Sequence, residues 1–221
     1  MTSLQLPALL LVTLFVPGAA SARQSGSVDS QKILAALELR EGLTVCEIGA
    51  GDGELSIAAG RAVGAQGRVY TSELGSERVK ALREKIDRSG LTQVTVVEGD
   101  PVKTNFPEGA CDALFMRNVY HHFADPAAMN SSIAASLKEG GRLAIVDFGP
   151  PPGNEVARPA DRGKDGMHGI TAPTLERELK DAGFQPVSSE PGSQRWFLIV
   201  VSKPKAQDCD SALPGHERNC A

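Results

Sequence analysis

The sequence predicts an α/β domain built on a parallel sheet. Segments with the apolar spacing of helices alternate with short apolar runs typical of buried strands, and this order favours a parallel sheet. A glycine cluster follows the first such run. Of the 221 residues, 41% are hydrophobic and 23% are charged, which is the balance of a folded globular protein. A single domain of ordinary size is therefore expected.

The charge and cysteine content exclude several classes of protein. The chain has 23 Lys plus Arg against 27 Asp plus Glu, a formal net charge of -4, and no patch that combines basic and aromatic residues. Neither feature suggests a nucleic-acid partner. The 4 cysteines are too few for a disulfide scaffold, and none lies in a CxxC pair. No metal site is expected.

The N-terminal segment has the features of a signal peptide. Residues 4–16 are uncharged and almost wholly apolar, a Pro-Gly pair follows at 17–18, and residues 20–22 read Ala-Ser-Ala, a small-x-small cleavage pattern. The apolar run is shorter than the roughly 20 residues of a membrane span. We expect a signal peptide over 1–22, export to the periplasm or medium, and no stable membrane span afterwards. The alternatives are an apolar N-terminal helix, a membrane tether or a cytoplasmic location.

The rest of the chain divides into alternating elements. Helices are expected around 33–41, 54–63, 79–90, 125–138 and 171–182, and strands over 43–48, 68–73, 94–98, 111–116, 141–148 and 195–203. Asp125-Pro126 is a strong helix start, and Gly90 a helix end. Residues 149–169 show no periodicity. The domain is expected over 23–203, with a flexible tail over 204–221 whose Cys209 and Cys220 either pair or remain free thiols.

The glycine cluster at 47–53, Glu-Ile-Gly-Ala-Gly-Asp-Gly, lies between a predicted strand and a predicted helix. Glycines there let the backbone turn tightly and approach a ligand. A dinucleotide fingerprint needs a third glycine at position 54, where Glu54 stands, and Asp52 with Glu54 would repel a pyrophosphate. S-adenosylmethionine, which is not a polyanion, suits this turn. A nicotinamide-dependent oxidoreductase is the alternative.

Two further carboxylates follow predicted strands. Glu73 ends the second strand and could accept hydrogen bonds from both ribose hydroxyls of an adenosine. Asp100 follows the third strand and could accept from the adenine amino group. Ligands of open α/β sheets bind at these carboxyl ends, so the two carboxylates and the acidic glycine cluster before them predict one nucleoside site.

These motifs resemble those of class I S-adenosylmethionine-dependent methyltransferases of the small-molecule group (types 11 and 25). The resemblance covers about residues 31–203 and rests on VCEIGAGDGELS, VYTSEL, VVEGD, ACDALFMRNVYHHF and LKEGGRLAIVDF. It implies a Rossmann-like, doubly wound α/β sheet of seven strands, six of them parallel and the last inserted antiparallel. The implied cofactor is S-adenosyl-L-methionine, and the implied partner is a small-molecule acceptor.

The resemblance also implies site residues. The residues that it implies for cofactor binding are Glu47, Gly49, Gly51, Gly53, Glu73, Asp100, Arg117 and Asn118. Methyl transfer is an in-line displacement that needs a general base only if the acceptor arrives protonated. The candidates for that catalytic role are Tyr120, His121, His122 and His168. We expect at most one of the two adjacent histidines to face the cleft. Alternatively, a histidine caps the loop or pairs with Asp125, or the chain is a non-catalytic nucleoside-binding relative.

Two other groups of residues bear on the acceptor. Residues 149–169 carry Arg158, Arg162, Lys164 and His168, which would suit an anionic acceptor, although Asp161 and Asp165 offset them and a solvated loop is the alternative. Cys46 and Cys111 lie in predicted buried strands and are expected to be inert core residues. Thiol chemistry of the arsenite-methyltransferase kind is therefore not expected. The atom methylated and the oligomeric state stay open.

Overall fold

A computed structural model describes residues 30–154, 158–164, 168–192 and 194–206. The expected signal peptide and the tail beyond residue 206 lie outside the described residues. The strands are β1 Thr44–Ile48, β2 Arg68–Glu73, β3 Val94–Glu98, β4 Cys111–Arg117, β5 Leu137–Phe148, β6 Gln185–Pro191 and β7 Trp196–Ser202. The helices are α1 Ser30–Ala36, α2 Glu54–Val63, α3 Ser76–Ser89, α4 Pro126–Ser136 and α5 Ala172–Asp181, with short 3-10 turns η1 Tyr120–His122 and η2 Pro159–Asp161.

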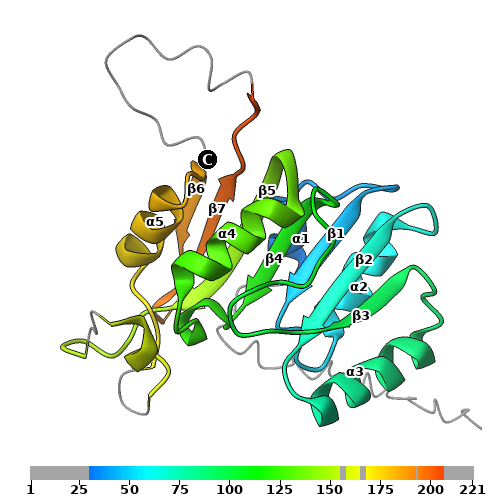
Figure 1. The fold of residues 1–221 in the computed structure, drawn as a ribbon, viewed down its shortest axis with the longest axis horizontal. Coiled ribbons are helices and arrows are strands. Elements are labelled where there is room, and N and C mark those ends of the chain that lie inside the picture. The colour runs from blue at the N-terminus through cyan, green and yellow to red at the C-terminus, as the bar shows by residue number, and fades with distance from the viewer. Residues whose placement is uncertain (1–29, 155–157, 165–167, 193, 207–221) are drawn as a thin grey trace, which may run out of the picture.

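The strands form one seven-stranded sheet in the order β3-β2-β1-β4-β5-β7-β6 (Figure 1). Every pair from β3 to β5 is parallel, whereas β7 is antiparallel to both β5 and β6. β7 is therefore inserted in the opposite direction between two strands that run the same way. The predicted α/β class and the implied seven-stranded sheet with one antiparallel strand are confirmed.

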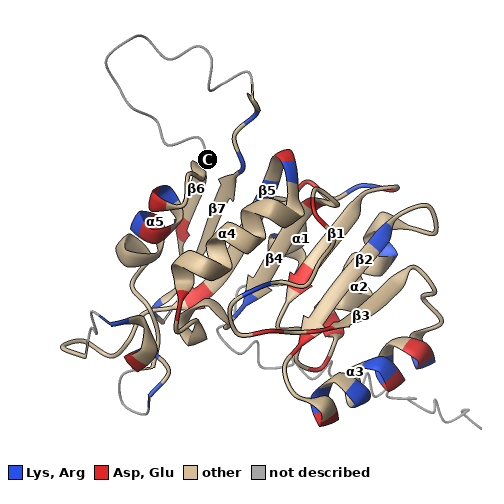
Figure 2. Ribbon diagram, viewed as in Figure 1, with Lys and Arg blue, Asp and Glu red and all other residues tan. Residues whose placement is uncertain are grey.

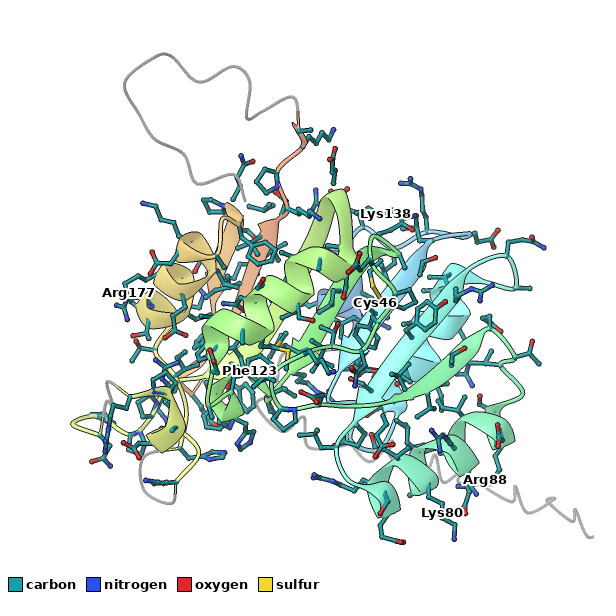
Figure 3. All side chains as sticks on the ribbon, viewed as in Figure 1. Cys46, Lys80, Arg88, Phe123, Lys138 and Arg177 are labelled. Atoms are coloured by element: carbon teal, nitrogen blue, oxygen red, sulfur yellow. A yellow bond between two sulfur atoms is a disulfide. The ribbon has the colours of Figure 1, made fainter. Side chains whose placement is uncertain are left out.

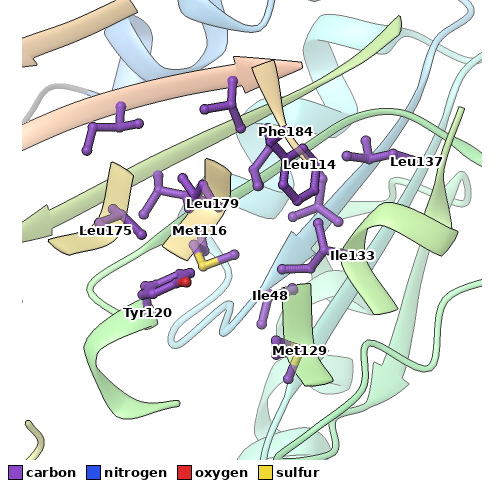
Figure 4. Close-up of a cluster of buried hydrophobic side chains, with 14 of the residues drawn as sticks. Ile48, Leu114, Met116, Tyr120, Met129, Ile133, Leu137, Leu175, Leu179 and Phe184 are labelled. Atoms are coloured by element: carbon purple, nitrogen blue, oxygen red, sulfur yellow. The ribbon is translucent and has the colours of Figure 1, made fainter. Parts of the chain in front are cut away.

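Helices cover both faces of the sheet. One apolar cluster joins α4 and α5 to the sheet and includes Met129, Ile133 and Leu175 (Figure 4). The cluster on the other face joins α1, α2 and α3. Charged residues colour the outer surfaces of α3 and α5, while the central strands are largely uncharged (Figure 2). Burial of apolar surface on both sides explains why the central strands read as continuous apolar runs.

Local signals set several helix ends as predicted. The Asp125 side chain accepts a hydrogen bond from the Ala128 N–H at 3.0 Å, and a proline occupies the first turn of α4. Gly90 ends α3 in the left-handed conformation, with φ 71°. The expectation that the α4 helix runs to residue 138 was wrong, because β5 already begins at Leu137, which is fully buried and pairs with Cys111.

Strand β6 was not identified from residue patterning. Its sequence, QPVSSEP, is polar and mostly exposed, and it contains two prolines. It pairs only with β7, so it forms the edge of the sheet. Prolines are tolerated on an edge strand because one side has no ladder partner. The strand thus depends on β7 and not on an apolar pattern of its own.

Cys46 and Cys111 form a disulfide between β1 and β4, with their Cα atoms 5.9 Å apart (Figure 3). Both residues are fully buried, as expected of inert core residues, but their pairing was not predicted from the sequence. The two strands are neighbours in the sheet, and this brings residues 65 positions apart into bonding distance. The bond joins two of the central strands.

Within the described part of the chain, no helix combines the length and the apolar character needed to cross a membrane.

Candidate functional site

A cavity of about 590 Å³ lies at the carboxyl ends of the first four strands. This volume is within the usual range of small-molecule sites, roughly 300–1,000 Å³. Its walls include six of the residues expected to bind a cofactor, namely Gly49, Gly51, Glu73, Asp100, Arg117 and Asn118. It also has apolar walls, among them Ile48, Val119, Phe123 and Met129. The location agrees with the general rule for ligands of open α/β sheets.

The glycine turn between β1 and α2 leaves one open approach to the backbone. Gly49, Gly51 and Gly53 all have positive φ, at 74°, 55° and 75°. A Cβ on Gly49 would lie 2.4 Å from Val119 Cγ2, and one on Gly53 would lie 2.7 Å from Leu82 Cδ1. A Cβ on Gly51 would meet nothing within 4 Å. Gly49 and Gly53 therefore serve the packing of the turn, whereas Gly51 exposes backbone to the cavity.

The Glu73 carboxylate lies against this turn and is 8% exposed. Its Oε2 accepts a hydrogen bond from the Gly51 N–H at 2.7 Å, and its Oε1 accepts one from the Leu74 N–H at 2.9 Å. Arg78 Nε lies 3.6 Å from Oε1. A carboxylate has about four lone-pair sites, so two backbone bonds leave acceptor capacity for hydroxyl groups in the cavity.

The remaining predicted cofactor residues of the cavity wall come from other strand ends. Asp100 follows β3, and its Oδ1 accepts a hydrogen bond from the Val102 N–H at 2.9 Å. Asn118 follows β4 with φ 60°, and its N–H donates to the Val146 carbonyl at 2.9 Å. Arg117, beside it, also lines the cavity, whose other charged residues are Glu73, Arg78, Asp100 and Lys103.

Glu47 lies in β1 but does not line the cavity. Its carboxylate is 2% exposed, accepts a hydrogen bond from Thr71 Oγ1 at 3.0 Å and also bonds to Ser56 Oγ. Burial raises the pKa of the Glu47 carboxyl to about 7, although the hydroxyls of Ser56 and Thr71 act in the opposite direction. The geometry gives Glu47 a role in joining β1, β2 and α2, in place of the direct cofactor contact that was expected.

Of the four candidates for a general base, only His122 lines the cavity. Tyr120 is fully buried in the apolar cluster, and its hydroxyl accepts a hydrogen bond from Asn130 Nδ2 at 2.8 Å (Figure 4). Burial raises the pKa of the Tyr120 hydroxyl. Tyr120 is thus placed as a core residue, and it does not reach the cavity.

The two adjacent histidines lie in η1, and their ring centroids are 4.0 Å apart. His121 is fully buried, and its partner is Asp147, not the Asp125 that was considered as an alternative, with Nδ1 and Oδ1 separated by 2.7 Å. His168 Nε2 lies 3.1 Å from His121 Nε2. Partial removal from water lowers the pKa of the His122 imidazole, and the neighbouring imidazoles of His121 and His168 lower it further.

The basic residues of the irregular segment are already paired. The Arg162 guanidinium is 2% exposed and forms two hydrogen bonds with the Glu178 carboxylate, at 3.0 and 2.6 Å. Arg158 and Lys164 both pair with Asp161. These ion pairs give no support to an anionic acceptor, and Arg162 instead anchors the segment to α5.

Sequence reasoning missed Asp147 and the apolar wall. Asp147 lies near the end of β5, so the rule that selected the acids after β2 and β3 could also have found it. Val119 and Met129 carry no chemical signal in the sequence. They line the cavity because η1 and α4 fold over the strand ends.

The residues present suit S-adenosylmethionine. Gly51 leaves open space where a side chain would stand, Glu73 offers free acceptor positions beside it, and Asp100 lies on the same wall. The apolar wall can exclude water from a methyl group. The apolar side chains and the free acceptor positions of Glu73 match a nucleoside that carries a methyl group.

Comparisons with known proteins agree with this geometry. A family model described as a methyltransferase domain matches residues 23–189. The ubiquinone/menaquinone biosynthesis C-methyltransferase UbiE of Pseudomonas aeruginosa is 32% identical over 128 residues, which cover 56% of this chain and 48% of that protein. The chain thus spans about half the length of the curated relatives it matches.

Solved structures share the fold at low sequence identity. A SAM-dependent methyltransferase from Aquifex aeolicus superposes with a TM-score of 0.67 at 24% identity, covering 79% of this chain and 89% of that one. Haemonchus contortus phosphoethanolamine N-methyltransferase 2, in complex with S-adenosyl-L-methionine, superposes with a TM-score of 0.67 at 17% identity, covering 80% and 52%. At these identities the likeness shows the fold.

Proposed function

This chain belongs to the methyltransferase-domain family and has its class I fold, and from that membership we propose that it transfers the methyl group of S-adenosylmethionine to a small-molecule acceptor. The observation that carries the proposal is the hydrogen bond from the Gly51 N–H to Glu73, which joins the glycine turn and the predicted ribose acceptor in one cavity wall.

Each part of the cavity has a task in this reaction. S-adenosylmethionine, when bound, supplies an electrophilic methyl group on a sulfonium. Gly51 admits the ligand to the backbone, and Glu73 and Asp100 orient its nucleoside. Arg117 and Asn118, which line the same cavity, are proposed to hold its carboxylate end. Because the leaving thioether is neutral, rate acceleration comes chiefly from positioning and from exclusion of water.

The acceptor is proposed to enter beside His122. This histidine lines the cavity together with Val119, Phe123 and Met129, so an acceptor there would contact apolar side chains and one imidazole. The curated relatives act, by their names, in quinone biosynthesis. A small and partly apolar acceptor suits the same kind of wall.

The chain is also proposed to act after export. Buried disulfides persist in oxidising compartments and are rare in the cytosol. The Cys46–Cys111 disulfide is fully buried between central strands, which supports the export expected from the N-terminal sequence.

Calorimetric titration of the chain with S-adenosylmethionine, S-adenosylhomocysteine, NAD and NADH tests the proposed cofactor. Saturable binding of the first two alone supports a methyltransferase. Binding of the nicotinamides alone would replace the proposal with an oxidoreductase. If S-adenosylmethionine binds but no methyl group is transferred to any of a broad panel of small acceptors, a non-catalytic nucleoside-binding role is favoured.

A further inference from the structure

The three histidines next to the cavity form a cluster that the methyl-transfer reaction does not explain. His121, His122 and His168 each offer one ring nitrogen, and these nitrogens all lie within 4.8 Å of one another. Two of the residues come from η1, and the third comes from a segment 47 positions further along the chain. We propose that His121, His122 and His168 form a binding site for a divalent transition-metal ion of the zinc type.

The spacing of the ring nitrogens suits such an ion. Zinc binds imidazole nitrogen at about 2.0–2.1 Å, so two ligands of a tetrahedral site lie roughly 3.3 Å apart. His121 Nε2 and His168 Nε2 are 3.1 Å apart. The ring of His122 is exposed and can turn toward them. Three protein ligands leave a fourth position open, as in catalytic zinc sites.

Asp147 holds His121 in the form that a metal ligand requires. One oxygen of this buried carboxylate lies 2.7 Å from His121 Nδ1, and the other accepts the backbone N–H of His121 at 3.1 Å. The Phe148 N–H also donates to Asp147, at 2.9 Å. With its proton on Nδ1, His121 presents a lone pair at Nε2, on the side of His168. A carboxylate behind a ligating histidine is the usual outer partner in metal sites.

The backbone that follows His168 is held by two hydrogen bonds. Arg162, held by Glu178 in a buried ion pair, accepts the Gly169 N–H on its carbonyl at 3.1 Å, and the Ile170 N–H bonds to the Phe148 carbonyl at 2.9 Å. Gly169 has φ 125°, and a Cβ there would lie 2.6 Å from the Phe148 carbonyl oxygen. The segment can therefore pass close to the end of β5 only with glycine at this position, and this passage brings His168 to the cluster.

Glycine also leaves room beside His122. A Cβ on Gly163 would lie 3.0 Å from His122 Nδ1. Because His122 also lines the cofactor cavity, an ion in the cluster would lie at the edge of that cavity. Its open position could then bind a hydroxyl, thiol or amine of the acceptor; this role rests on the proposed function, whereas metal binding does not.

Metal titration of the untagged full chain tests the site. We expect one Zn²⁺ per chain by calorimetry, displacement of Co²⁺ by Zn²⁺, and no comparable binding of Mg²⁺, which prefers oxygen ligands. Co²⁺ should give the intense visible bands of four-coordinate nitrogen ligation. His168→Gln should weaken Zn²⁺ binding by more than about 100-fold, and Asp147→Asn by about 10- to 100-fold.

His216→Ala is the matched control, since it removes the one histidine of the sequence that is not among the proposed ligands, and it should leave Zn²⁺ binding unchanged. Equal Zn²⁺ affinity in the wild type and in His168→Gln would overturn the proposal. If a cluster variant does not fold, the Co²⁺ spectrum of the wild type decides, because weak octahedral bands would contradict the proposed four-coordinate site. A site that binds Zn²⁺ in a chain that does not bind S-adenosylmethionine would separate this inference from the proposed function.

Discussion

Glu73 Oε2 accepts the backbone N–H of Gly51 at 2.7 Å, and this bond connects the end of β2 to the turn that follows β1. The same carboxylate accepts the Leu74 N–H, so its orientation is fixed before a ligand arrives. A preorganised acceptor loses less conformational freedom on binding, which makes Glu73 the residue whose removal should be most informative.

Glu73→Ala is expected to weaken S-adenosylmethionine binding by about 10- to 150-fold. This corresponds to about 1.5–3 kcal/mol for hydrogen bonds to a charged group. The control is Glu77→Ala, which removes an exposed carboxylate in the first turn of α3. Calorimetric dissociation constants for both variants provide the comparison, and an unchanged constant for Glu73→Ala would refute the ribose assignment.

Removing the disulfide should destabilise the domain. The chain-entropy model gives about 4 kcal/mol for a cross-link that closes a loop of 65 positions. Urea unfolding of the Cys46→Ala/Cys111→Ala variant should therefore show a lower free energy of unfolding than the oxidised wild type. Mass spectrometry of the wild type after alkylation in denaturant without reductant should find both residues unmodified. Full alkylation of both before reduction would contradict the pairing.

The buried ion pair between Arg162 and Glu178 should behave asymmetrically. Arg162→Met leaves the Glu178 carboxylate, which is 17% exposed, without its partner and is expected to cost about 3 kcal/mol of stability. The double variant Arg162→Met/Glu178→Leu should recover much of this loss, because no unpaired charge remains. Urea unfolding of the two variants measures the difference. Equal losses in both would show that packing, and not the unpaired charge, is responsible.

The raised pKa of Glu47 predicts a pH dependence of stability. Because the pKa of the Glu47 carboxyl is about 7 in the folded state and its ordinary value is 4.5, the folded state binds more protons between these two pH values. The contribution of Glu47 to the free energy of unfolding is about 3 kcal/mol. It is fully present below about pH 4.5 and is lost as the pH rises to about 7. Glu47→Gln should remove this fall in the free energy of unfolding. The same slope in both proteins would show that Glu47 is not the group involved.

Local chemistry explains which parts of the fold could be predicted. Asp125-Pro126 and Gly90 mark helix ends through bonds to near neighbours, and both were identified from the sequence. Strand β6 lacks such a signal, because its polar residues adopt strand geometry only through pairing with β7. The start of β5 was also missed, since Leu137 continues the apolar pattern of the preceding helix.

The site shows the same division. Gly51, Glu73 and Asp100 follow strands, and the chain order alone places them at one edge of the sheet. The pairing of Cys46 with Cys111 and the approach of His168 to His121 depend on strand register and on the path of an irregular segment. Neither is readable from spacing, so these contacts required the three-dimensional structure.

A crystal structure of the chain with S-adenosylhomocysteine tests the central claim most directly. The account predicts that the ribose hydroxyls bind to the Glu73 carboxylate and that the adenine lies beside Asp100. It also predicts that the protein backbone at Gly51 contacts the nucleoside. A ligand bound elsewhere, or one in this cavity with its ribose remote from Glu73, would contradict it.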